Sequence, residues 1–383
     1  MKIKSSELYL TIALFAICCL MDTGLTIYRI IGLALLGIAV LHVLFQKQIV
    51  VTAPIVNFWS WFIILWVFIT VHTFLFTDWS WGWRGIIIYL LPAVAVVVYF
   101  STGFTKMEII EDFYNATIYA AILSILYVTV KELPAIMAGG SRIGDSASGN
   151  VNALAINLCS FFAVLLFEAI YLERKRLFPL LVILSLFILL TGSKKGVVGI
   201  FIIIVILFAG KYRLKVWKYI LPIIILLLVY ELIMNNSYFY AIIGRRVDAF
   251  FSALETKQSN NSTGERLSMY QLGWNYFRSS PWLGNGYGYF AKYSLFSTYS
   301  HSNYIELLVS FGLLGFLLYY SQYIRIIIKV IKNIKKNMIT ILCITIIALQ
   351  LFFDTASIGY YNDARFYIFI FFMLIFLEDE YMY

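Results

Sequence analysis

The segment SHSNYIELL at residues 300–308 holds the side chains best suited to acid–base chemistry in this sequence. His301 is followed by Asn303 and, about one helical turn later, by Glu306. An unperturbed imidazole has a pKa of about 6.5, so a histidine near water accepts a proton at ordinary pH. The N-terminus of the helix predicted from residue 303 would favour the neutral ring. We therefore take His301 as the candidate base and Glu306 as a second candidate catalytic residue. A plain polar anchor at a helix start is the alternative for His301.

A set of cations lies in connections between apolar segments on the predicted outer face, where the positive-inside rule leads us to expect few of them. A single such cation is typical of a solvated or snorkelling side chain. Several at one membrane face suit an anionic headgroup, because guanidinium and ammonium groups bind phosphate oxygens directly. A diphosphate on a lipid carrier is the obvious anion of this kind. The candidate substrate-binding residues are Arg84, Arg142, Lys194, Lys195, Arg245 and Arg266, with Asn303 beside the histidine.

The composition decides what kind of elements must position these residues. The 383 residues are 62% hydrophobic and only 13% charged, whereas a soluble domain is about a quarter charged. The chain is therefore an all-α polytopic membrane protein, and its net charge of +9 indicates loop orientation and not a nucleic-acid partner. All four cysteines lie in apolar runs, which favours packed free thiols. The N-terminal apolar stretch lacks a cleavage signature, so we expect it to be the first retained helix.

Apolar runs bounded by charge, Gly or Asn predict about twelve transmembrane helices. Several runs are shorter than an ideal span, which tilt and interfacial Tyr and Trp anchors can absorb. We treat residues 1–383 as one integral membrane domain. The predicted spans are 8–22, 27–45, 57–76, 83–100, 109–130, 151–172, 177–192, 196–210, 219–234, 303–324, 339–353 and 364–377.

The distribution of Lys and Arg predicts the orientation of these spans. With both termini in the cytoplasm, short inner segments hold sixteen of the 29 Lys and Arg residues, including KYRLKVWK (211–218) and RIIIKVIKNIKK (325–336). The opposite orientation would export both segments, against the positive-inside rule. Residues 235–302 then form one large extracytoplasmic loop that carries part of the active site. We expect the protein in the cytoplasmic, or inner, membrane.

The glycine-rich stretch SPWLGNGYGYF (280–290) is not a nucleotide-binding motif. No strand–turn–helix unit surrounds it and no acidic residue follows at the required distance. Gly284, Gly286 and Gly288 are better explained by a tight loop. The aromatic side chains Trp282, Tyr287 and Tyr289 could form a sugar platform or anchor the loop at the interface; both interpretations stay open. No metal site is predicted, because the two remaining histidines lie far apart in spans without acidic partners.

Taken together, TGERLSMYQLGWNYFRSSPWLGNGYGYF and SHSNYIELLVSFGLLGFLLYY resemble the signature region of the O-antigen ligase and polymerase superfamily, which includes Wzy-type polysaccharide polymerases. The resemblance also covers SRIGDSASGNVNALAINL, with Asn150 and Asn152 at a helix entry, and the hairpin LLTGSKKGVVGIF. It is strongest over about 140–320. The hairpin departs from the pattern, because Lys194 and Lys195 stand where the family typically has Arg. Lysine keeps the charge but loses bidentate recognition. The motif residues are Arg266, Pro281, Trp282, Gly284, Gly286, His301, Asn303, Glu306, Gly312 and Gly315.

The resemblance implies a GT-C-like fold and a metal-independent, inverting glycosyltransferase without cofactors. Its donor and acceptor would be glycans on undecaprenyl diphosphate, and its product capsule, exopolysaccharide or O-antigen. A ligase that transfers finished glycan to lipid A core, protein or cell wall is the first alternative. A non-catalytic transporter of lipid-linked glycan is the second, although its polar residues would be expected near the bilayer midplane. Partners implied are membrane lipids, a chain-length regulator and a flippase.

Overall fold

The computed structural model describes residues 3–21, 25–46, 52–77, 83–138, 142–212, 224, 230–245, 248, 262–333, 337–361 and 363–378. For residues 83–88, 135, 136 and 138, and for a few others, only the backbone is described. Within these ranges the chain is helical and contains no strand. The all-α prediction is therefore confirmed.

The long helices follow the apolar runs. Every predicted span except 219–234 coincides with a helix, and most of 219–234 lies outside the described residues. These helices are α1 (Ser5–Cys19), α2 (Leu25–Phe45), α3 (Ala53–Phe76), α4 (Trp83–Phe100), α5 (Lys106–Ala138), α7 (Val151–Tyr171), α8 (Phe178–Leu190), α9 (Lys194–Tyr212), α15 (Asn303–Asn333), α16 (Ile339–Asp354) and α17 (Ala364–Phe376).

Six of these helices are long and apolar enough to cross a membrane, namely α2, α3, α5, α7, α9 and α15, and several shorter apolar helices accompany them. The chain is a multi-pass membrane protein. Two helices continue past their predicted ends, α5 to Ala138 and α15 to Asn333. The prediction stopped at Lys131 and Arg325, but a charged side chain marks the edge of an apolar run and does not break a helix.

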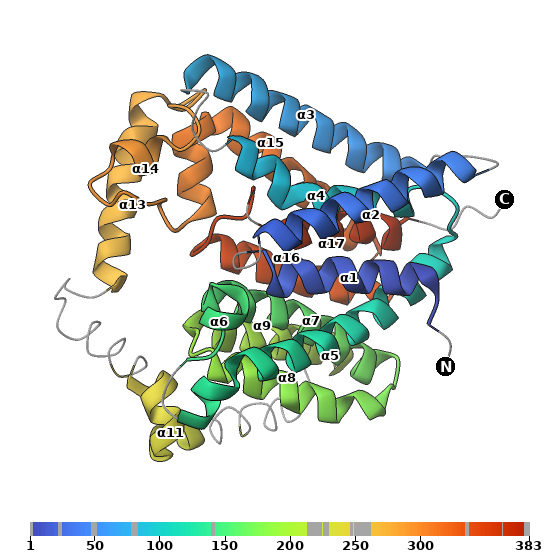
Figure 1. The fold of residues 1–383 in the computed structure, drawn as a ribbon. Coiled ribbons are helices and arrows are strands. Elements are labelled where there is room, and N and C mark those ends of the chain that lie inside the picture. The colour runs from blue at the N-terminus through green and yellow to red at the C-terminus, as the bar shows by residue number, and fades with distance from the viewer. Residues whose placement is uncertain are drawn as a thin grey trace.

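The helices pack around α7 and α17, which are buried on nearly all sides. α1 lies along α5, α2 lies along α4, and α9 packs against both α7 and α16. The start of α1 and the end of α17 lie at the same end of the bundle (Figure 1). There Lys4 pairs with Glu111 and Lys329 with Glu378, each at 2.8 Å. We call this the terminal end.

The opposite end of the bundle carries several short helices that the structure describes between α9 and α15 (Figure 1). Its helices are α11 (Ser237–Phe239), the π-helical turn η3 (Tyr240–Gly244), α13 (Ser262–Ser279) and α14 (Tyr289–Tyr293), and α6 (Asp145–Ser148) lies in the connection before α7. α13 packs on the first part of α15 through a small cluster around Met269, Phe290 and Val309. We call this the pocket end.

α15 is broken at Gly312, whose φ of 63° and ψ of −163° are not helical. The segment 280–286 fills the break. The backbone N–H groups of Asn285 and Gly286 donate to the carbonyls of Val309 and Ser310 at 2.8 and 3.0 Å. On the other side of the break, Leu313 and Leu314 donate to the carbonyls of Pro281 and Trp282 at 2.8 and 3.2 Å. The glycine-rich stretch therefore has a structural role, as a clip inside a transmembrane helix.

Candidate functional site

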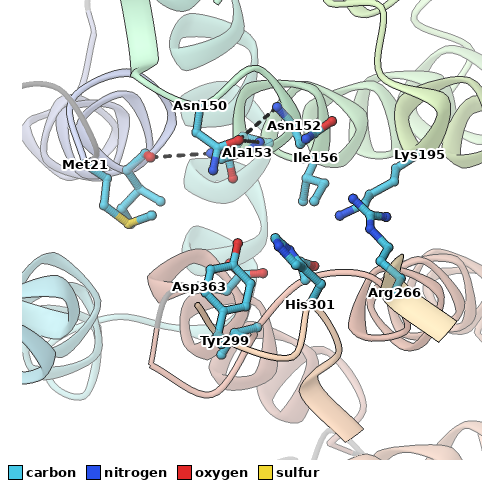
Figure 2. Close-up of a pocket in the computed structure, with 14 residues that line it drawn as sticks. Met21, Asn150, Asn152, Ala153, Ile156, Lys195, Arg266, Tyr299, His301 and Asp363 are labelled. Atoms are coloured by element: carbon cyan, nitrogen blue, oxygen red, sulfur yellow. Dashed lines mark hydrogen bonds between the residues drawn. The ribbon is translucent and has the colours of Figure 1, made fainter. Parts of the chain in front are cut away.

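A cavity of about 80 Å³ opens at the pocket end, and Figure 2 shows its lining. Three of the predicted site residues, Lys195, Arg266 and His301, line it together. They are separated by up to about a hundred residues in the sequence, so only the fold brings them together. The complete lining consists of Ile17, Met21, Asn150, Asn152, Ala153, Ile156, Asn157, Lys195, Arg266, Tyr299, His301, Ser357, Ile358 and Asp363.

The lining comes from the ends of six segments. These are the end of α1, the first turns of α7 and α9, the start of α13, the connection before α15 and the connection between α16 and α17. The charge distribution predicts that all of these connections lie on the same, extracytoplasmic face. Their convergence in one cavity agrees with the predicted alternation of the spans.

His301 lies at the centre of the lining, and its ring centroid is 4.4 Å from that of Tyr299 (Figure 2). Its φ of 56° is in the left-handed region, which non-glycine residues adopt rarely and which is concentrated at functional sites. Burial, together with the positive charges of Arg266 and Lys195, lowers the pKa of His301 to about 4. The imidazole is therefore neutral at pH 7, as a base requires.

The two cations approach the cavity from different elements. Lys195 stands in the first turn of α9 and donates to the carbonyl of Ala356. Arg266 extends from α13 toward Lys195 (Figure 2). Within the described residues the Arg266 guanidinium has no hydrogen-bond partner, so its donors are available to a ligand.

Two asparagines add neutral donors beside these cations. The side-chain oxygen of Asn150 caps α7 by accepting from the N–H groups of Asn152 and Ala153 at 3.0 and 3.2 Å. The side-chain oxygen of Asn152 accepts from the Ser193 hydroxyl at 2.9 Å. Because both oxygens are already engaged, the amide NH₂ groups remain to face the cavity. The N-termini of α7 and α9 add positive potential, so the arrangement favours an anion rich in oxygen acceptors.

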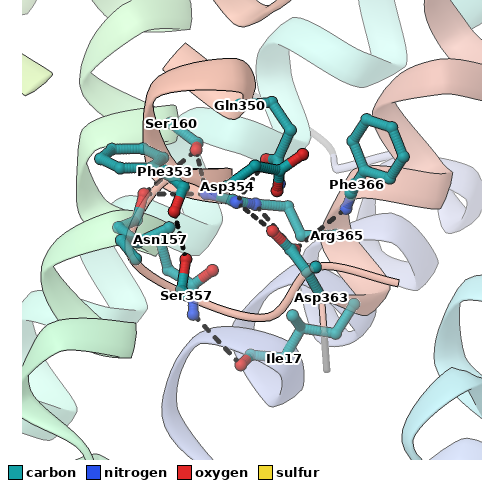
Figure 3. A network of polar contacts seen from close by, with 12 residues as sticks. Ile17, Asn157, Ser160, Gln350, Phe353, Asp354, Ser357, Asp363, Arg365 and Phe366 are labelled. Carbon is teal, nitrogen blue, oxygen red and sulfur yellow. Dashed lines mark hydrogen bonds and ion pairs between the residues drawn. The ribbon is translucent and has the colours of Figure 1, made fainter. Parts of the chain in front are cut away.

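Asp363 supplies the carboxylate of the lining. It accepts from the Nε and Nη2 atoms of Arg365 at 3.2 and 2.5 Å, and it caps α17 through the N–H of Phe366. Arg365 is only 2% exposed and continues inward to Gln350 and the α7 residues Ile156 and Ser160, as Figure 3 shows. The aspartate is therefore fixed in place by a buried cation.

Two predicted residues lie beneath the cavity and not in its lining. Glu306 is buried and accepts from the backbone N–H and the hydroxyl of Ser300 at 2.9 and 2.8 Å. Asn303 is fully buried and accepts from the N–H groups of Gly359 and Tyr360 at 2.8 and 3.0 Å. Both side chains thus hold the two loops that carry His301 and Asp363.

The other predicted cations are spread over the pocket end. Arg142 is half-buried and donates from Nε to the carbonyl of Thr191 at 2.6 Å, which ties it to the hairpin before α9. Lys194 and Arg245 are exposed, and neither lines the cavity. Arg84 stands in the first turn of α4, but its side chain lies outside the part of the chain that the structure describes.

Sequence reasoning missed Asp363 and Arg365, and it considered Asn150 and Asn152 only within the family resemblance. A signal for the charged pair was present. The motif NDARF puts two opposite charges at the edge of an apolar span, where buried charge is costly unless it is paired or functional.

A comparison with family models supports the interpretation of this geometry. The model of the O-antigen ligase family matches residues 179–320. This part of the chain belongs to the O-antigen ligase and polymerase superfamily. The match includes Lys195, Arg266 and His301, whereas Asn150, Asn152 and Asp363 lie outside it. No curated protein is similar enough to the chain to count as a match.

The superfamily comprises ligase- and polymerase-type enzymes that act on lipid-linked glycans at the membrane, and this coarse function applies to the chain.

Proposed function

We propose that the protein is a polymerase that joins undecaprenyl-diphosphate-linked oligosaccharide repeats by inverting glycosyl transfer at the extracytoplasmic face of the cytoplasmic membrane. The observation that carries this proposal is the convergence of Lys195, Arg266 and a neutral His301 in one cavity. In a glycosyl transfer with a diphosphate leaving group, the cations would stabilise the negative charge of the diphosphate, and the neutral base would accept the proton of the acceptor hydroxyl.

In the proposed reaction an acceptor sugar hydroxyl attacks the anomeric carbon of the donor glycan. A new C–O bond forms on one face while the bond to the diphosphate oxygen breaks on the other, so the configuration inverts. The hydroxyl proton goes to His301, and the bond electrons leave with the lipid diphosphate. Lys195 and Arg266 stabilise the charge that develops on the leaving group, which is electrostatic preorganisation without a metal.

The amide donors extend this anion site. Asn150 and Asn152 lie on the same side of the cavity as the N-terminus of α7 and would donate to diphosphate or sugar oxygens. Asp363 would accept from a hydroxyl of the acceptor sugar and orient it toward His301. We retain Arg142, Lys194, Arg245 and Arg84 as contacts for the outer parts of a large lipid-linked substrate, which exceeds the small cavity.

Glu306 and Asn303 act differently in this scheme. Since neither lines the cavity, we assign both as positioning residues that hold the loops before α15 and before α17.

The second candidate is a ligase that transfers finished glycan to a lipid A core, protein or wall acceptor. One observation favours it, because the matching family model is described as O-antigen ligase. A non-catalytic transporter is a third candidate. Its polar residues would be expected near the bilayer midplane, whereas the cavity is lined by residues from helix ends and connections.

Deletion of the gene followed by gel analysis of the surface glycan separates these candidates. Loss of a polymerase leaves single repeat units, whereas loss of a ligase leaves long polymer on its lipid carrier. Loss of a transporter leaves repeat units on the cytoplasmic side. Complementation with His301→Ala should behave like the deletion, and normal glycan length and amount in that strain would show that His301 is not catalytic.

A further inference from the structure

The Pro–Trp–Leu turn at residues 281–283 is the apolar tip of the clip that enters α15. Its flanking backbone groups are satisfied by protein. The carbonyls of Pro281 and Trp282 accept from Leu313 and Leu314, and the Ser280 hydroxyl donates to the carbonyl of Gly284 at 2.7 Å. Irregular backbone is tolerated at membrane depth only where its polar groups are paired in this way.

The side chains of the turn, by contrast, have few protein neighbours. Trp282 is 65% exposed and Leu283 is 39% exposed, and Pro281 is also exposed. Neither Trp282 nor Leu283 lines the cavity with His301. The turn therefore presents a continuous apolar surface that the site does not use.

This surface continues onto two membrane spans. On α3, the neighbouring last turn exposes Phe74, Leu75 and Phe76, and on α15 the turn after the break exposes Leu314 and Leu317. Because α3 and α15 are both long enough to cross the membrane, these exposed apolar side chains face lipid. The Pro–Trp–Leu turn thus lies between two lipid-facing surfaces.

The contacts with α3 fix the depth of the turn. The backbone of Leu283 lies beside the ring of His72. A methyl group placed on Gly286 would lie 2.6 Å from the Thr77 hydroxyl and 2.9 Å from the carbonyl of Phe76. The clip therefore runs along the final turn of α3, about 6 Å of helix from Thr73 to Thr77 at roughly 1.5 Å per residue. The end of a helix long enough to cross the membrane is expected near the edge of the hydrocarbon.

We propose that residues 281–283 form an anchor embedded in the bilayer leaflet at the pocket end, with phospholipid as its partner. Leu283 and Pro281 contact acyl chains, and the Trp282 indole lies at the headgroup boundary, where tryptophan is enriched in membrane proteins. The same clip holds the first part of α15, which follows His301 by two residues. Lipid contact with the anchor therefore fixes the height of the candidate base relative to the membrane surface.

Site-specific fluorescence tests this proposal without using enzyme activity, so its outcome is independent of the proposed function. The full-length variant Leu283→Cys is labelled with an environment-sensitive fluorophore and reconstituted into nanodiscs of phosphatidylglycerol and phosphatidylethanolamine. Some of the lipids carry a nitroxide quencher at a shallow acyl position. Leu75→Cys provides the lipid-facing control and Ser268→Cys, on the exposed side of α13, the aqueous control. The four native cysteines are buried, and unsubstituted protein gives the background labelling.

We expect lipid-borne nitroxide to quench the label at position 283 as strongly as at 75 and at least about twofold more than at 268. Quenching that matches position 268, with access to aqueous iodide, would overturn the anchor. A sugar-binding turn predicts a third pattern, in which added lipid-linked glycan protects the label from iodide and nitroxide lipid has no effect. That pattern would also overturn the proposal.

Discussion

At the scale of single residues, the charge of His301 is governed by its neighbours in the cavity. The pKa of about 4 results from burial and from the nearby charges of Arg266 and Lys195. A bound diphosphate would offset both cations, so it should raise the pKa of His301 and strengthen the base when the donor is in place.

This coupling predicts that the pH profiles of kcat/KM and kcat fall at different pH values on their acid sides. A base is lost as the pH falls through its pKa, so kcat/KM, which reports free enzyme, should decline near pH 4. The limb of kcat, which reports the occupied enzyme, should lie at higher pH. Arg266→Gln removes one cation and should move the kcat/KM limb upward toward pH 6.5. These profiles are measured on purified protein with lipid-linked donor, and coincident limbs in wild type and variant would contradict the coupling.

If Asn303 is a positioning residue, its replacement should lower both the stability of the protein and kcat. Asn303→Ala leaves the buried N–H groups of Gly359 and Tyr360 without their acceptor, which costs roughly 1–3 kcal/mol for each group. We expect a lower melting temperature and a fall in kcat of tenfold or more, with little change in donor affinity. Asn303→Asp keeps the acceptor and should recover part of both losses.

A second variant tests the other hydrogen bond of Asn303, which its side-chain NH₂ donates to the Tyr320 hydroxyl. Tyr320→Phe removes only the hydroxyl that accepts from Asn303 at 3.0 Å and donates to Asp354. It should change stability without a comparable effect on kcat. A large loss of donor affinity in Asn303→Ala would instead mean that this residue contacts the substrate.

At the scale of elements, the break in α15 depends on two glycines that face one another. A methyl group on Gly312 would lie 2.4 Å from the carbonyl of Trp282, and one on Gly284 would lie 2.5 Å from the backbone N–H groups of Phe311 and Gly312. Both residues also have positive φ, at 63° and 76°. Gly312→Ala and Gly284→Ala should therefore each destabilise the clip and abolish activity.

Gly37→Ala provides a matched control for these variants. Gly37 lies inside α2, and apart from the backbone of that helix no atom of the described residues lies within 4 Å of an added methyl group. Alanine is also the better helix former. We expect this variant to keep wild-type yield, melting temperature and activity in the same membrane preparation. Active, stable Gly312→Ala protein would show that α15 can run straight without loss of the site.

The sequence was sufficient to predict the spans because burial in lipid demands long apolar runs. It could not predict the break at Gly312, because transmembrane helices tolerate glycine. The break is recognised only from the hydrogen bonds that segment 280–286 makes with the backbone on both sides of it. The sequence offered Lys195, Arg266 and His301 as candidates because each stands in a segment predicted to connect spans at the extracytoplasmic face. It missed Asp363, which becomes interpretable only when Arg365 is seen to hold it from the buried side.

At the scale of the whole molecule, the proposed function depends on which side of the membrane the pocket end faces. Ser268 lies on α13 at the pocket end, and Arg176 lies in the connection between α7 and α8, a segment predicted to be cytoplasmic. Both are exposed. The proposed reaction requires the pocket end to face outward, because the extracytoplasmic face is where the proposed polymer is made.

Labelling of intact cells with a membrane-impermeant maleimide checks this orientation. Ser268→Cys should react in intact cells, and Arg176→Cys should react only after lysis, since the native cysteines are buried. The reverse pattern would put His301, Lys195 and Arg266 in the cytoplasm. The anion site could then still bind a lipid diphosphate, but it would meet repeat units before their export, and polymerisation at the outer face would be wrong. The pattern we expect leaves the cavity open to the compartment in which exported repeat units meet a growing chain.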